Sequence, residues 1–260
     1  MIKRMTYIAL TIILIGGSVY LASYAGIEHR YLRYRSFQLR VINPLEHPLV
    51  TEEELKDTLL ALFGDFEGKD LNSVPLFDIE QFLNTNPYVF KTNVYSTLNG
   101  EISVSVLTRI PMLRVINIYS ESAIIDTSGV MMPVSQDHPV RLTVATGNIE
   151  EHFLQGIARN LNVRSLQQGA MLRELFEITC SISKDKFLDA LIGQIYVNSD
   201  QEIELIPKIG EQVILFGSSE DICKKLEKLK AFYLEVMKHE GWDVYKKINL
   251  TFENQVVCSK

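Results

Sequence analysis

Residues 89–108 read VFKTNVYSTLNGEISVSVLT, and this stretch decides how the first half of the chain folds. Two segments rich in β-branched and aromatic residues, Val89 to Thr97 and Glu101 to Thr108, flank the sequence Leu98-Asn99-Gly100. Asn-Gly between alternating apolar runs is the strongest short-range signal for a β-hairpin. We therefore predict two antiparallel strands joined by a tight turn.

The sequence before this hairpin predicts one strand followed by two helices. Residues 37–42 alternate apolar and polar side chains, as a half-buried strand does. Thr51 with Glu54 predicts a capped helix to about Phe63, and we expect a second helix to start at Asp78 as its N-cap. Two helices can cover one face of a three-stranded sheet. We predict an α+β domain of this β-α-α-β-β order over residues 37–111.

The rest of the chain, residues 112–260, is predicted to form a second α+β domain, a mixed β-sheet with covering helices. Short β-rich segments recur from Leu113 to Phe216. Helical periodicity predicts helices over residues 148–161, 167–180 and 219–239. A last strand is predicted from Lys247 to Val257.

The N-terminus carries an apolar run that predicts a single transmembrane helix. Residues 6–25 contain no charged side chain, and about 20 such residues span a bilayer. A cleaved signal peptide is the alternative, with Ser23 to Ala25 as its cleavage site. In the first interpretation residues 1–5 are a cytoplasmic tail and residues 26–36 a juxtamembrane linker. The arginines that follow the run leave the orientation unsettled by charge alone.

Composition and motifs argue against catalysis and against nucleic-acid binding. The formal net charge is -6, and the body of the chain has no concentrated basic stretch. The sequence has no Gly-x-Ser-x-Gly, phosphate loop or His-Glu-x-x-His motif, and its five histidines have no ligand spacing. Three widely spaced cysteines suggest neither a disulfide framework nor a zinc site. We expect no enzyme activity, cofactor, metal or small-molecule substrate.

The predicted last strand is the candidate site for a partner protein. Unpaired backbone groups on a strand at a sheet edge can accept a strand from a partner, which is called β-augmentation. A last strand that only completes the core explains the same pattern equally well.

Three segments and their order resemble a known family. Gly68-Lys-Asp-Leu-Asn-Ser-Val74, Asn86-Pro-Tyr-Val89 and Val104-Ser-Val-Leu-Thr-Arg-Ile-Pro111 follow one another as in the POTRA domain of the FtsQ/DivIB cell-division proteins. The family has Glu where this chain has Thr108. The resemblance continues through Tyr119 to Pro133 and residues 202–217 to the end of the chain. The segment from Trp242 to Phe252 looks most like members from Bacteroidetes.

This resemblance implies a noncatalytic divisome scaffold in the bacterial inner membrane, with a cytoplasmic N-terminus and periplasmic domains enriched at the septum. It implies FtsB-like and FtsL-like partners, other divisome components, and a role in controlling septal peptidoglycan synthesis. In relatives the last strand pairs with a strand of FtsB. By position that strand corresponds here to Asn249, Leu250, Thr251, Phe252, Glu253, Asn254, Gln255 and Val256. The alternative is a POTRA-containing envelope protein in outer-membrane assembly or secretion.

Overall fold

The computed structural model describes residues 11–21, 34–43, 48–242 and 244–260. Contacts divide the chain into two units, with residues 34–43 and Val50–Thr108 in the first and Arg109–Lys260 in the second. Pro111, where we expected the first domain to end, is instead the first residue of a strand in the second unit.

The predicted membrane segment lies only partly within the described residues. Residues 11–21 are helical and their side chains are exposed, including Ile13 at 71%. The expected cytoplasmic tail, both ends of the expected span and most of the expected linker lie outside the described residues. Within the described ranges, no helix is both long enough and apolar enough to span a membrane.

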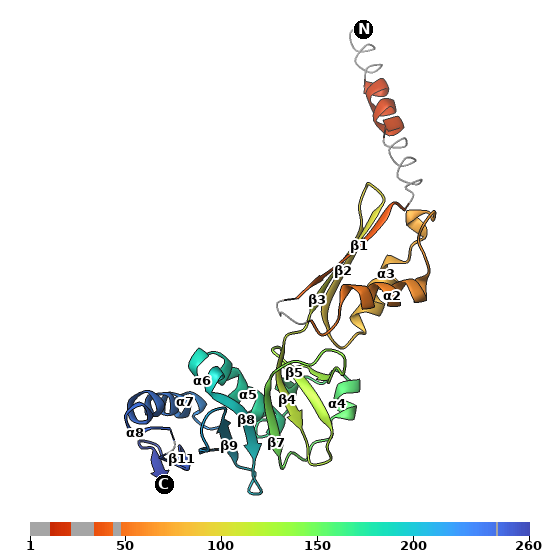
Figure 1. Cartoon of the computed structure of the whole chain (residues 1–260). Helices are drawn as coiled ribbons and strands as arrows, with labels where there is room; N and C mark the ends of the chain where they lie inside the picture. Colours follow the sequence, from red (N-terminus) through yellow and green to blue (C-terminus); the bar gives the residue numbers. More distant parts are fainter. Residues whose placement is uncertain (1–10, 22–33, 44–47, 243) are drawn as a thin grey trace. The chain divides into compact units, whose positions relative to one another are not determined.

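The first unit contains the predicted three-stranded sheet (Figure 1). Its strands are β1 (Ser36–Ile42), β2 (Val89–Ser96) and β3 (Glu101–Thr108), in the order β1-β3-β2. β1 runs parallel to β3, and β2 runs antiparallel to it. The backbone N–H of Thr97 donates to the carbonyl of Glu101 at 2.8 Å, which closes the turn. The hairpin prediction is confirmed.

Two helices supply the rest of this unit's core. Thr51 caps α2 (Glu52–Phe63) in the predicted capping box with Glu54. The other helix, α3 (Leu76–Asn84), starts two residues before the expected cap, so Asp78 lies in its first turn and Pro75 is the N-cap. A short 3-10 turn, η2 (Leu71–Ser73), precedes it. Apolar side chains of both helices pack on alternate residues of β3; they include Leu55, Leu59, Ile79, Leu83, Ile102, Val104 and Val106.

The second unit is built on a nine-stranded mixed sheet in the order β12-β11-β10-β9-β8-β7-β4-β5-β6. β4 pairs with β7, β7 with β8 and β10 with β11 in parallel, and the other neighbours are antiparallel. The strands are β4 (Pro111–Ile116), β5 (Ser122–Asp126), β6 (Met131–Pro133), β7 (Thr143–Gly147), β8 (Ile192–Val197), β9 (Ile203–Pro207), β10 (Val213–Gly217), β11 (Lys247–Asn249) and β12 (Val257–Ser259).

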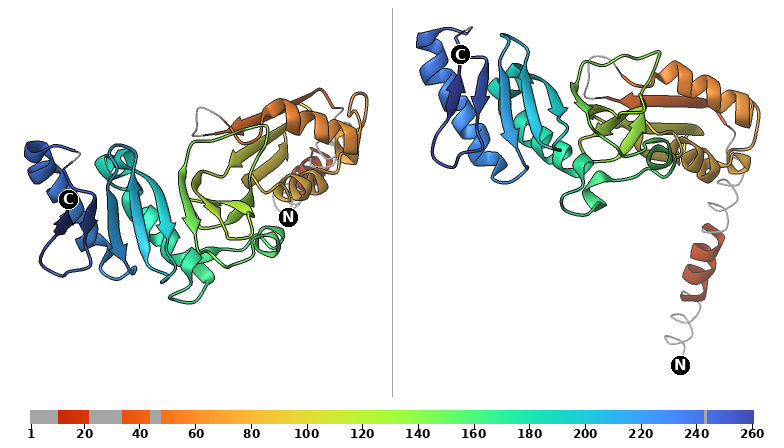
Figure 2. Two further views of the ribbon diagram at one scale, coloured as in Figure 1. Left: turned by 60° about the horizontal axis from the view of Figure 1, so that its bottom comes forward. Right: turned by 90° about the horizontal axis from the view of Figure 1, so that it is seen from below.

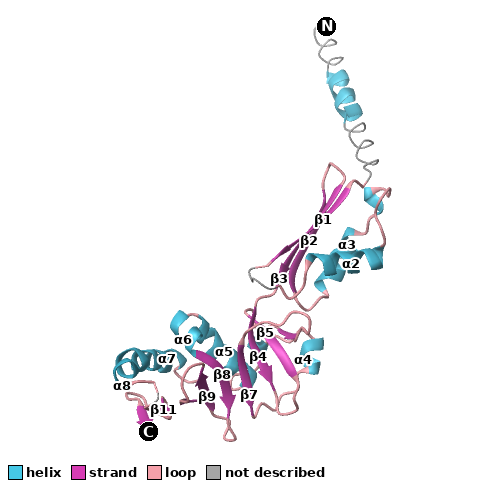
Figure 3. Cartoon of the chain, in the orientation of Figure 1, coloured by secondary structure: helices cyan, strands magenta, loops and turns pink. Residues whose placement is uncertain are grey.

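Helices cover one face of this sheet. Alternate residues of its strands, such as Leu205 and Ile214, share one buried cluster with apolar residues of α5, α6 and α7, which lie along the sheet in Figure 3. The helical elements are α4 (Leu154–Ala158), η3 (Val163–Ser165), α5 (Met171–Ser183), α6 (Lys186–Leu191), α7 (Ile222–Ala231), the π-helical turn η4 (Phe232–Met237) and α8 (Lys238–Glu240). The fold is α+β, as predicted.

Two helix predictions need correction. The helix expected over residues 148–161 is shorter in the structure and consists of α4 alone. Backbone carbonyls before α4 accept hydrogen bonds from other parts of the chain: that of Ile149 from Ile118 N–H, and that of Glu151 from the Asn117 side chain. The helix expected over residues 219–239 starts at Ile222 and passes through the π-helical turn η4.

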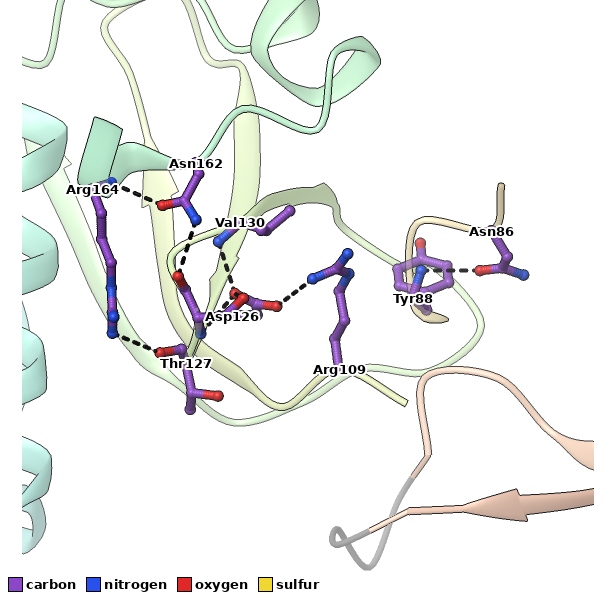
Figure 4. Close-up of polar contacts among 9 residues, drawn as sticks. Asn86, Tyr88, Arg109, Asp126, Thr127, Val130, Asn162 and Arg164 are labelled. Carbon is purple, nitrogen blue, oxygen red and sulfur yellow. Dashed lines mark hydrogen bonds and ion pairs between the residues drawn. The ribbon is translucent and has the colours of Figure 1, made fainter. Parts of the chain in front are cut away.

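A buried carboxylate fixes the turn between β5 and β6. Asp126, 1% exposed, accepts hydrogen bonds from Ser128 N at 2.9 Å and from Val130 N at 2.7 Å, and it pairs with Arg109 at 2.8 Å (Figure 4). Asn162 donates to the carbonyl of Ser128 in the same turn. Asp126 therefore stabilises the turn by accepting hydrogen bonds from nearby backbone N–H groups. Asn86 makes a similar local bond in the first unit, accepting from Tyr88 N.

Candidate partner-binding site

The two ends of the nine-stranded sheet differ in what covers them. At the β6 end, Met131 N–H donates to the carbonyl of Leu161, and Val163 N–H donates to that of Gly129. Pro133, the last residue of β6, has no backbone N–H to offer another strand. The β6 end is therefore largely closed by the chain itself. At the other end β12 pairs with β11 alone among the described strands.

The terminal hairpin is where the structure departs from the predicted site. The prediction of a single strand from Lys247 to Val257 is wrong. β11 ends at Asn249, and the chain returns as β12 after a connection (Figure 2). Ile248 lies opposite Cys258 in this antiparallel pair. The side chain of Asn249 accepts hydrogen bonds from Thr251 N at 2.8 Å and Thr251 Oγ1 at 2.7 Å. Such local side-chain bonds favour turns over extended ladders, which explains why β11 stops there.

The eight candidate residues therefore do not form a strand edge. Asn249 closes β11, and residues 250–256 make up the connection to β12. Leu250 is fully buried in the core of the unit, and Val256 is packed partly against that core. Phe252 lies in the exposed part of the connection with 45% of its surface accessible. The structure brings these residues together beside the sheet edge, in a loop.

The free edge belongs to β12, residues 257–259, none of which is among the eight candidate residues. Val257 is 42% exposed and Ser259 is exposed. One side of this short strand pairs with β11, so its other side presents backbone N–H and C=O groups without a neighbouring strand in the described structure. The chain turns at Glu253 and Asn254. Because asparagine favours turns, Asn254 is the residue in the sequence that could have indicated the hairpin.

A groove of about 960 Å³ lies beside the hairpin. It is lined by the start of α7, the end of β10 and the first part of the connection, and many of its residues are acidic. Lys225 is one of its lining residues: its Nζ donates to the carbonyl of Ser218 and lies 5.0 Å from the centre of the Phe216 ring. Burial lowers the pKa of Lys225, which is held by these contacts inside the unit.

The groups exposed at this edge suit recognition of a partner by backbone pairing. Burial raises the pKa of the Cys258 thiol, which disfavours the reactive thiolate. In the part of the chain that the structure describes, no three His, Cys, Asp or Glu side chains gather into a group that could hold a metal ion. What the edge offers is backbone donors and acceptors beside exposed apolar side chains.

Each of the two units matches a model of a known protein family. A POTRA-like domain model matches residues 35–107, and a model described as FtsQ/DivIB, C-terminal related matches residues 110–259, which is more than half of the chain. No curated protein matches the chain. These family matches imply a role in cell division, and the family is generally a noncatalytic scaffold. A POTRA-like unit followed by this C-terminal domain means that the chain belongs to the FtsQ/DivIB family.

Proposed function

We propose that this chain is a noncatalytic scaffold of the bacterial divisome that recruits small membrane-anchored partners of the FtsB and FtsL kind. Through them, and with other divisome components, it helps to control septal peptidoglycan synthesis. A scaffold of this kind needs no small-molecule substrate. The family match over residues 110–259 supports the proposal.

We also propose that residues 6–25 hold the chain in the inner membrane as a single helix. Residues 1–5 then lie in the cytoplasm, and both units lie in the periplasm and are enriched at the septum. The absence of charge from residues 6–25 and the exposed apolar side chains of the helix at residues 11–21 support this arrangement.

The partner is proposed to bind by adding a strand to β12. The single observation that carries this proposal is the difference between the sheet ends, since β6 is covered by residues 161–163 whereas β12 has β11 on one side only. A partner strand would complete the hydrogen bonding of β12, and backbone pairing of this kind tolerates changes in side chains. Phe252 and Val257 would supply the neighbouring apolar contacts.

Site-specific photo-cross-linking in native membranes tests this proposal. A photoreactive amino acid is placed at Ser259 on the free edge, and a matched variant carries it at Pro133 on the covered edge. We expect Ser259 to cross-link to a small single-pass protein and Pro133 to give no such product. Equal labelling from both positions would refute an edge-specific site. Cross-links to outer-membrane assembly factors would support a role in assembly or secretion instead.

A further inference from the structure

One lysine of α7 holds the connection between β11 and β12. Lys228 Nζ donates to the backbone carbonyls of Leu250 at 3.0 Å, Phe252 at 2.5 Å and Glu253 at 3.4 Å. A lysine ammonium has three N–H donors, so these three acceptors satisfy all of them. Hydrogen bonds to a charged donor are roughly twice as strong as neutral ones. Lys228 therefore joins the helix to a segment more than twenty residues later in the sequence.

Apart from the packing of Leu250 and Val256 at its two ends, the connection has few other contacts that fix its course. Leu250 is held by its burial and by its N–H, which donates to the carbonyl of Leu215. Thr251 bonds to Asn249, its near neighbour. Side chains from residue 251 to residue 255 are exposed. Among the bonds described for the connection, those of Lys228 are the ones that tie its exposed part to the rest of the unit.

The stability of β12, the strand that follows, depends on the connection being held in one conformation. β12 has three residues and pairs with β11, which also has three. β12 lies at the edge of the sheet and is short, so few backbone hydrogen bonds hold it in place. Releasing the connection would return conformational freedom to its residues, and β12 would leave the sheet more often. The contact that holds the connection therefore also controls how often the free edge exists.

The other lysines of α7 have different partners, so this role is specific to one position. Lys224 pairs with the exposed Asp221 on its own helix, and Lys225 bonds to Ser218. The fourth, Lys230, contacts Asp185 at the start of α6. Lys224 lines the same groove, and its charge interacts with that of Glu253, but it donates no described hydrogen bond to the connection, which makes it a control for the loss of charge alone.

We infer that Lys228 is a positioning residue for partner binding: it fixes the connection, keeps β12 in the sheet and so keeps the edge ready for a partner strand. Its effect on the partner rests on the proposed function, whereas its effect on the hairpin does not.

The first test is hydrogen exchange of the full-length chain in mild detergent, without a partner. We expect peptides covering residues 247–259 to exchange about tenfold faster in Lys228→Met, which keeps an aliphatic side chain but loses the three donors.

In the same experiment Lys224→Met should exchange like the unchanged protein, and Lys228→Arg should restore protection because its guanidinium also donates to carbonyls. Equal exchange in Lys228→Met and the unchanged chain would overturn the inference.

The second test combines these substitutions with cross-linking from Ser259. We expect Lys228→Met to reduce the cross-linked product several-fold while the urea midpoint of the unit stays unchanged, and Lys228→Arg to recover the product. Faster exchange with an unchanged yield would overturn the positioning role. If the unchanged chain gives no partner product, the proposed function fails, and the exchange result still decides whether Lys228 orders the hairpin.

Discussion

Replacing Asp126 by alanine is expected to lower the free energy of unfolding of the second unit by about 3–5 kcal/mol, the usual effect of breaking a buried ion pair by removing one partner. The carboxylate is 1% exposed and the Arg109 side chain is 15% exposed, so little solvent screens the pair. The substitution also removes the acceptor for the N–H groups of Ser128 and Val130. These losses overlap, so their separate energies are not added.

Urea unfolding of the full-length chain in mild detergent measures this effect. Trp242 is the single tryptophan and packs on Tyr233 at 5.4 Å between ring centres, so its fluorescence reports the second unit. With a denaturant slope of about 2 kcal/mol per M, the midpoint should fall by about 1.5–2.5 M. Asp126→Asn keeps one acceptor oxygen and should lose less. A midpoint for Asp126→Ala within about 0.3 M of the unchanged protein would refute the reasoning.

For three further substitutions the structure predicts the direction of the effect on stability, on its pH dependence or on hydrogen exchange. Tyr233→Phe should raise the stability by about 1–2 kcal/mol in urea unfolding, because the hydroxyl of this buried tyrosine has no hydrogen-bond partner among the described atoms and the substitution removes it. The Phe153 N–H lowers the pKa of Glu121 below its ordinary 4.5, so its stabilisation is present above that pH and is lost as the pH falls through the lowered pKa. Glu121→Gln should therefore flatten the decline of the midpoint in acid. Gly217→Ala should speed hydrogen exchange in the terminal hairpin, because φ is +75° and a Cβ would lie 2.9 Å from Thr251 Cγ2.

The parts of the fold that follow from local signals could be predicted from the sequence. Asn99-Gly100 and the capping box at Thr51 act within a few residues, so their effect is visible in the sequence. The helix expected over residues 148–161 failed for the opposite reason. Its apolar spacing fits a helix, but Ile149 bonds to Ile118, which is distant in the sequence. Such a contact outweighs local preference and leaves no periodic signal.

The continuous strand predicted for the candidate site differs from the structure. Apolar and polar residues alternate from Ile248 to Phe252, which is the pattern of a continuous strand. The structure ends the strand inside that pattern because the side chain of Asn249 bonds to Thr251 and Lys228 binds the next carbonyls. The first contact is local and was overlooked. The second joins residues that only the folded chain brings together, so the sequence carried no sign of it.

From β7 to β12, the order of the strands in the sheet is the same as their order in the sequence. On that side of the sheet each strand after β7 is laid beside the one that precedes it, with helices inserted before β8 and β11. A strand donated to β12 by another protein would take the next place in this series. Assembly with a partner would then be an intermolecular continuation of folding, with the growing sheet as the template for both.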